Sequence, residues 1–108
     1  MADKISSYDE FWPYYLREHS KVSCRRLHYF GTTLALFCLI AAIALKTPWL
    51  ILLALVAGYG PAWVAHFFVE KNRPATFTYP LWSLYSDFRM YFYWIGGRLP
   101  AELKKAGI

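Results

Sequence analysis

The three histidines of this 108-residue chain, His19, His28 and His66, are the residues best suited to chemistry. Neutral imidazole is a common ligand of divalent first-row metals. Histidine near a lipid bilayer is costly unless it has a partner or a function. Three converging imidazoles would hold a metal ion and leave coordination positions open, as catalytic sites do. Whether they converge depends on the elements that carry them.

Two apolar segments separate and border these histidines. Leu27–Leu45 contains 19 residues without a formal charge, and Thr47–Val69 contains 23. Each segment is long enough to cross a hydrocarbon core of about 30 Å at about 1.5 Å per residue. The short connection between them predicts a helical hairpin with spans over 27–45 and 48–69. The fold class expected is therefore an all-α integral membrane protein.

A hairpin returns the chain to the membrane face that it left. His28 opens the first span and His66 closes the second, so both are expected at the same face. His19 precedes the first span on that face. All the imidazole of the chain would then lie at one depth, and this placement predicts a metal site.

Composition and charge agree with a membrane protein. The hydrophobic fraction is 57%, the aromatic fraction is 20% and the mean hydropathy is +0.23, values too apolar for an ordinary small soluble domain. The first segment is long for a signal peptide, so we expect the chain to insert uncleaved. The net charge of +5 comes from cations bordering apolar spans, which predicts contact with anionic lipid and no binding of nucleic acid.

The cations are distributed unequally around the spans. Arg17, Lys21, Arg25, Arg26, Lys71 and Arg73 flank the open end of the predicted hairpin, whereas Lys46 is alone in its turn. The positive-inside rule therefore predicts that both termini and the three histidines are cytoplasmic.

The segment before the first span predicts an amphipathic helix over residues 8–20. Its apolar positions recur at helical spacing: Tyr8, Phe11, Trp12, Tyr15 and Leu16. We expect this helix to lie on the membrane interface with its aromatic face toward the lipid, after a polar, frayed segment at residues 1–7. His19 and His28 would face opposite ways on one straight helix, so a break is expected at Ser20–Ser23, with Ser23 as an N-cap.

Residues 79–95 predict a further helix, interfacial or re-entrant. Thr78 is a candidate N-cap, Pro80 suits the first turn and glycines at 96–97 end the helix. Asp87 and Arg89 fall in its middle, which makes a third span the weaker interpretation. We expect Asp87 to pair with a nearby arginine, and a short polar tail to follow from Arg98.

Glu70 is the acidic residue placed closest to a histidine. It follows His66 by four residues, on one face of an α-helix. It could be a fourth metal ligand, a carboxylate that orients an imidazole, or a solvated partner of Lys71 or Arg73. We favour a catalytic role in which Glu70 orients an imidazole ligand. Two other interpretations stay open, which are structural histidines in a non-enzymatic membrane interaction or assembly protein, and haem ligation by two of the histidines.

Three segments of the chain carry a family resemblance. They are Tyr14–His19, Arg26–His28 with Gly31, and His66–Ala75. Together they resemble the Mpo-like 2-hydroxy fatty acid dioxygenase family over roughly residues 8–95. The pair of histidines separated by eight residues, followed by the distant His-x3-Glu-Lys-x2-Pro-Ala segment, carries the resemblance.

The resemblance implies a function and a set of site residues. It implies an iron(II)-dependent enzyme that uses O₂ to shorten a 2-hydroxy fatty acid by one carbon, with His19, His28 and His66 as the ligands of Fe(2+). The acyl tail would run into the bilayer or between helices. Nearby cations are candidates for binding the substrate carboxylate: Arg17, Arg26, Lys71 and Arg73. A homo-oligomer is compatible with this interpretation.

Overall fold

The computed structural model describes residues 5–108, and over this range the chain is helical and contains no strand. This confirms the all-helical class. Residues 1–4, part of the segment expected to be frayed, lie outside the described range. The elements in chain order are α1 (Tyr8–Arg17), α2 (Val22–Ala44), α3 (Leu50–Val64), the π-helical turn η1 (Ala65–Glu70), the 3-10 turn η2 (Ala75–Phe77), α4 (Pro80–Ile95) and α5 (Leu99–Lys105).

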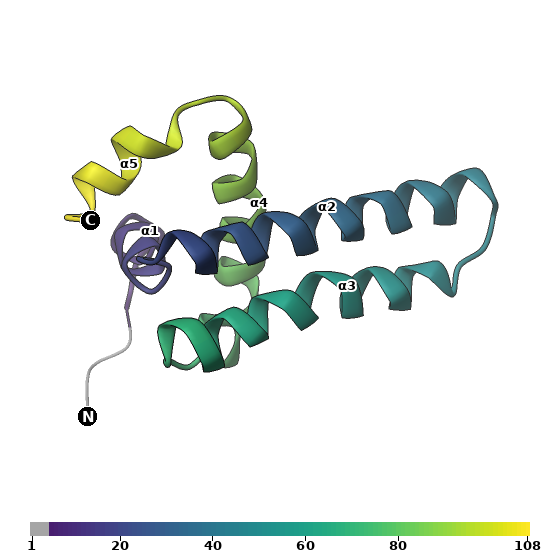
Figure 1. Cartoon of the computed structure of the whole chain (residues 1–108), viewed down its shortest axis with the longest axis horizontal. Coiled ribbons are helices and arrows are strands. Elements are labelled where there is room, and N and C mark those ends of the chain that lie inside the picture. The colour runs from purple at the N-terminus through teal and green to yellow at the C-terminus, as the bar shows by residue number, and fades with distance from the viewer. Residues whose placement is uncertain (1–4) are drawn as a thin grey trace.

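Helices α2 and α3 form an antiparallel hairpin, joined by the tight connection at one end (Figure 1). Small residues allow the two helices to approach closely. A Cβ added at Gly31 would lie 3.0 Å from the carbonyl oxygens of both Ala57 and Gly58. Further along the hairpin, a Cβ on Gly58 would lie 3.5 Å from that of Ala35. The tighter of these two contacts, at Gly31, lies toward the end of the hairpin that carries the histidines.

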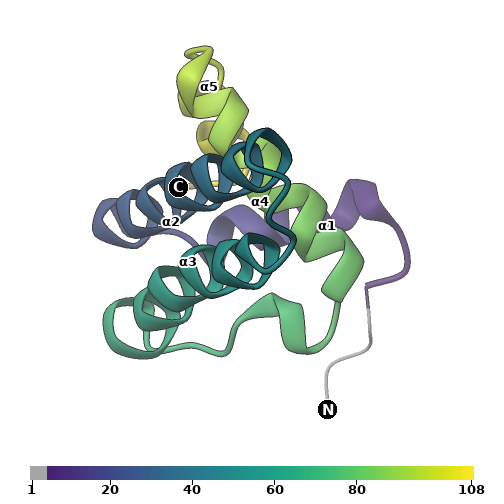
Figure 2. The same cartoon turned by 90° about the vertical axis from the view of Figure 1, so that its right-hand side faces the viewer.

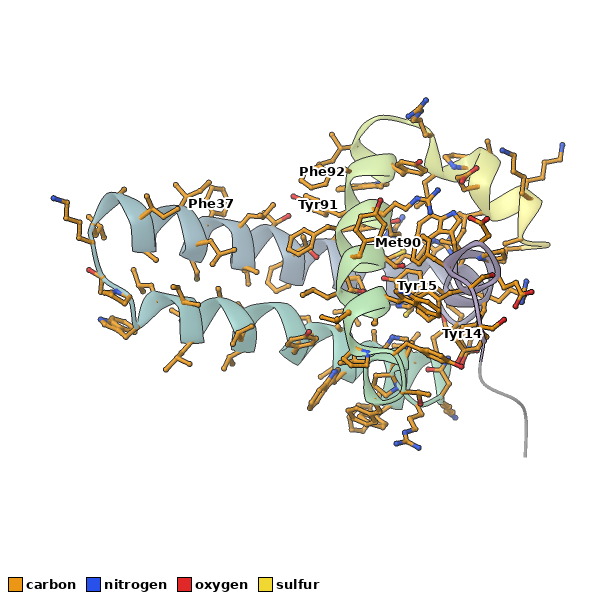
Figure 3. All side chains as sticks on the ribbon, turned by 180° about the vertical axis from the view of Figure 1, so that it is seen from behind. Tyr14, Tyr15, Phe37, Met90, Tyr91 and Phe92 are labelled. Carbon is orange, nitrogen blue, oxygen red and sulfur yellow. The ribbon has the colours of Figure 1, made fainter. Side chains whose placement is uncertain are left out.

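Within residues 5–108, two continuous helical segments are long and apolar enough to cross a membrane. They are Val22–Ala44, with a mean hydropathy of 1.8, and Leu50–Glu70, with 1.7. Only 22% of the most apolar window of each is buried. Large apolar side chains such as Phe37 and Ile43 are 66% and 81% exposed. Figure 3 shows Phe37 projecting from α2 on the side away from α3.

The remaining helices gather at the open end of the hairpin (Figure 1). Helix α4 crosses the hairpin steeply and lies along one of its faces (Figure 2). The aromatic face of α1 is buried against α4 and α5, in a core that includes Phe11, Tyr15 and Met90. Figure 3 shows Tyr15 and Met90 in this packed region. The expectation that this face contacts lipid was therefore wrong, because other helices of the chain cover it.

The helix ends differ from their predicted caps in two places. The N-cap of α2 is Lys21 and not Ser23. The N-cap of α4 is Tyr79 and not Thr78, although Pro80 takes the first position as expected. Gly96 ends α4 as predicted. The tail after Arg98 is not merely polar but forms α5, which buries Leu99 in the aromatic core.

Enlarging Gly31 should separate α2 from α3. In Gly31→Ala the new methyl group meets two backbone carbonyl oxygens that cannot move independently of α3. We expect a loss of about 1–3 kcal/mol in the free energy of unfolding, measured by sodium dodecyl sulfate titration in mixed micelles. Gly60→Ala is the matched control, because a Cβ at Gly60 meets no atom within 4 Å. Equal losses in both variants would show that close packing at Gly31 is unimportant.

Candidate metal centre

The three imidazoles converge at the open end of the hairpin. Nε2 of His19 lies 3.0 Å from Nε2 of His28 and 3.1 Å from Nε2 of His66. The candidate ligand atoms of all three lie within 4.8 Å of one another. The three side chains are between 1% and 5% exposed. The predicted convergence is thus confirmed, and the cluster comes from three different segments: the α1–α2 connection, α2 and η1.

The outer nitrogen of each ring contacts an oxygen that can only accept a hydrogen bond. Nδ1 of His19 lies 2.6 Å from the carbonyl oxygen of Tyr15, and Nδ1 of His28 lies 2.9 Å from that of Cys24. Nδ1 of His66 lies 2.7 Å from Oδ1 of Asn72. Each Nδ1 is therefore the protonated nitrogen, and each Nε2 of a neutral ring presents a bare lone pair to the centre of the cluster.

This donor set fits a metal ion. Three bare lone pairs at this spacing repel one another, and a bound cation removes that repulsion. At a metal–nitrogen bond of about 2.1 Å, two imidazoles at a right angle are about 3.0 Å apart. The two distances from His19 match this separation. Three nitrogens on one side of an ion leave further coordination positions open.

Electrostatics keep His19 neutral. Burial lowers the pKa of His19 well below its usual value, and the neighbouring imidazoles of His28 and His66 lower it further. A neutral ring is the form that binds metal. The hydrogen bond from Nδ1 to Tyr15 opposes this effect without overcoming it.

The break between α1 and α2 brings His19 into the cluster. Helix α1 ends at Arg17 and α2 begins at Val22, close to the predicted position. The guanidinium of Arg25 is buried and donates to the carbonyl oxygens of His19 (2.7 Å) and Ser20 (2.9 Å). These two bonds fix the connection in its turned conformation. Sequence reasoning placed Arg25 only among the flanking cations.

Glu70 joins the two ends of the hairpin. Its carboxylate accepts a 2.7 Å hydrogen bond from the backbone N–H of Lys21 and a 3.1 Å bond from Oγ of Ser20. The Lys21 ammonium donates to the carbonyl oxygen of Val69 at 3.0 Å. Glu70 thus caps the start of α2 from the end of η1. Among the hydrogen bonds of residues 5–108, none joins Glu70 to an imidazole.

Asn72 is the side chain that contacts His66, and sequence reasoning missed it. Lys71 has φ 59° and ψ 43°, the left-handed conformation, which turns the chain back toward the cluster. The backbone N–H of Asn72 donates to the carbonyl oxygen of His66, and its side-chain Nδ2 donates to that of Glu18. The second bond orients the amide so that Oδ1 faces His66. The sequence feature that could have identified Asn72 is its position as a polar residue just after the end of the helix that carries His66.

Asp87 lies near the cluster, and within residues 5–108 it has no arginine partner. Tyr15 stacks on the His19 ring with centroids 4.1 Å apart, and its hydroxyl donates to Asp87. Burial raises the pKa of Asp87 to about 7. Arg89 instead pairs with Glu102 at 3.8 Å. The expected ion pair of Asp87 was wrong, because the arginine that follows it points into the aromatic core.

The four cations predicted to bind substrate lie on the surface. All are exposed, and within residues 5–108 none of them hydrogen-bonds to an imidazole: Arg17, Arg26, Lys71 and Arg73. Arg73 packs over the ring of Phe77 at 5.2 Å. The structure brings the three histidines together but leaves these cations around the cluster.

The chain matches a known protein family over most of its length. The sequence profile of the Mpo1-like family, described as 2-hydroxy-palmitic acid dioxygenase Mpo1-like, matches residues 5–99. Searches of curated proteins and of solved structures found no match. The matched residues include the whole histidine cluster and Asn72.

Removing the amide of Asn72 should weaken metal binding. In Asn72→Ala the Nδ1–H of His66 loses its acceptor, so the ring is less well oriented and less basic. We expect the affinity for a divalent metal to fall by about 10–100-fold, measured by competition with a chromogenic chelator. Asn72→Asp keeps an acceptor oxygen and should retain most of the affinity.

Glu70→Gln separates the two roles considered for the carboxylate. A glutamine retains one acceptor oxygen for the start of α2, so metal affinity should change less than in Asn72→Ala. A tenfold or larger fall in Glu70→Gln would instead support the role predicted from the sequence, in which Glu70 orients an imidazole.

Proposed function

The chain belongs to the Mpo1-like family, and from this membership and the histidine cluster we propose that it is an iron(II)-dependent dioxygenase. Its substrate would be a 2-hydroxy fatty acid, shortened by one carbon. One O₂ balances this conversion if the products are the shortened acid, one carbon dioxide and one water. His19, His28 and His66 are the proposed ligands of the metal. The convergence of three bare Nε2 atoms is the observation that carries the proposal.

The residues of the chain have separate tasks in this proposal. When bound, iron(II) supplies the reaction with dioxygen that amino-acid side chains lack. The acceptors at Tyr15, Cys24 and Asn72 hold the three Nε2 atoms toward one point. The surrounding helices exclude water from the buried imidazoles. Glu70 maintains the site by joining η1 to the start of α2.

The substrate head offers two ligand atoms, a carboxylate oxygen and the adjacent hydroxyl. A cluster of three imidazoles leaves positions for both. The exposed cations around it would attract the carboxylate before it binds: Arg17, Arg26, Lys71 and Arg73. Exposed cations around a site act mainly on the rate at which an anionic substrate associates with it.

The assay that tests this function combines metal content with turnover. Purified protein loaded anaerobically with iron(II) should consume one O₂ for each 2-hydroxy fatty acid shortened. Alanine at any one of the three histidines should remove most of the metal and the activity. An unsubstituted fatty acid of equal length should be a poor substrate, because it lacks the hydroxyl ligand atom.

Three outcomes would contradict the proposal. Full metal occupancy in His66→Ala would remove that residue from the site. Equal turnover of hydroxylated and unsubstituted acids would argue against recognition of the hydroxyl. If the protein binds neither metal nor substrate, the histidines are structural and the chain is a non-enzymatic membrane protein.

Leu34→Ala, a change on the exposed surface of α2, is the matched control for the histidine-to-alanine variants.

We also propose that α2 and α3 cross the membrane, with the histidine cluster and both termini on the cytoplasmic side. The exposed apolar surface of the hairpin supports insertion. Helix α4 runs across the hairpin (Figure 1). If α2 and α3 cross the membrane, α4 would therefore lie along the membrane interface. The excess of cations at the open end supports the sidedness.

Cysteine labelling tests this topology. A membrane-impermeant maleimide added to intact cells should modify Lys46→Cys but not Arg17→Cys or Arg73→Cys until the membrane is permeabilised, because Lys46 alone would face outward. The unmodified chain is the control, since Cys24 is buried and Cys38 is partly buried. Labelling of all three variants from one side would exclude a two-span hairpin.

A further inference from the structure

A cavity of about 230 Å³ lies between α2, α3 and α4 and begins at the histidine cluster. His28 and Asp87 line one end of it. From there it follows the small residues that separate α2 from α3, including Ala35 and Gly58. The polar groups at one end and the apolar walls beyond are the pattern expected for an amphipathic ligand.

The far end of the cavity is formed by Leu39 of α2 and Ile51 of α3. These same two side chains line a second hollow of about 380 Å³, which continues toward the turn at Lys46 and Pro48. Leu39 and Ile51 therefore form a wall between two apolar spaces that are otherwise aligned along the hairpin.

The length of the first cavity suits an acyl chain. His28 and Leu39 are eleven residues apart on one helix, a distance of about 16 Å. With carbon–carbon bonds of about 1.5 Å, an extended hydrocarbon advances roughly 1.25 Å per bond. About a dozen bonds therefore reach from the histidine end to the wall.

We propose that this cavity holds the acyl tail of the substrate, and that Leu39 and Ile51 set the chain length that the protein accepts. The inference rests on the proposed function, because it takes the histidine cluster as the position of the 2-hydroxy carboxylate head. Continuity between the cluster and the cavity through His28 makes the tail its occupant.

Changing the wall should move the length preference in both directions. For the unmodified protein, the affinity for 2-hydroxy fatty acids should rise about fourfold per methylene until the tail reaches Leu39, and then level off. Leu39→Ala joins the two hollows and should extend this rise to longer chains. Leu39→Trp should end it at shorter chains. Affinity is measured by displacement of a fluorescent fatty acid.

Ile40 provides a matched control at the same depth of the hairpin. Its side chain is 62% exposed and does not line the cavity. Ile40→Ala and Ile40→Trp should leave the length at which affinity levels off unchanged. Equal shifts in the Ile40 and Leu39 variants, or no shift in either Leu39 variant, would overturn the proposal.

Photolabelling locates the tail without relying on turnover or on a variant. A 2-hydroxy fatty acid with a diazirine near its methyl end, of a length that reaches the wall, should label the side chains of Leu39 or Ile51, identified at residue resolution by fragmentation of the labelled peptides. A phosphatidylcholine with the same diazirine should instead label Phe37 and Ile40, which are exposed and line neither hollow. Equal labelling of the wall by both probes would make the cavity an ordinary lipid contact and overturn the proposal.

The two proposals fail in different ways. Labelling at the wall without oxygen consumption would support the tail site and contradict the dioxygenase. Oxygen-dependent shortening of the acid with labels confined to the outer surface would support the dioxygenase and contradict the tail site.

Discussion

The placement of three unprotonated nitrogens in a buried space is the constraint on which this structure depends. Burying a neutral imidazole without hydrogen bonds is unfavourable. In each of the three rings only Nδ1 hydrogen-bonds to an oxygen. The acceptor for each Nδ1 is close in sequence: Tyr15 for His19, Cys24 for His28 and Asn72 for His66. The Nε2 atoms, left facing one another at 3.0 and 3.1 Å, make the cluster a candidate site for a cation. Local hydrogen bonding thus determines the chemistry of the centre.

Polar contacts between distant segments then hold the three carriers together. Glu70 caps α2 at Lys21, Arg25 fixes the connection that carries His19, and Asn72 joins the turn after η1 to Glu18. All of these groups lie at the open end of the hairpin. The rest of α2 and α3 packs through small apolar side chains and makes few polar contacts. The hydrogen bonds that fix the geometry are therefore concentrated at the proposed site. The rest of the hairpin is held mainly by apolar packing.

The sequence predicted the elements better than the contacts between them. Uncharged segments and their length were enough to predict the hairpin, and its topology was enough to bring His28 and His66 together. The expectation for Glu70 assumed α-helical spacing, but the chain there forms a π-helical turn ending in left-handed Lys71. That geometry depends on tertiary contacts, so it left Asn72 unrecognised. Periodicity likewise identified the apolar face of α1 but not whether lipid or protein covers it.

One packing feature explains how a tight site and a hollow can lie in the same hairpin. At Gly31 the absence of a side chain lets the backbone of α3 approach closely, which fixes the separation of α2 and α3 near the histidines. One helical turn later Ala35 faces Gly58, where an added Cβ would meet Ala35 only at 3.5 Å, an ordinary van der Waals distance, and both residues line the cavity. Small residues therefore allow close contact at Gly31 and leave room for the cavity beside Ala35 and Gly58. Because both levels belong to the same pair of helices, any change in their separation alters the spacing of the imidazoles and the shape of the cavity together.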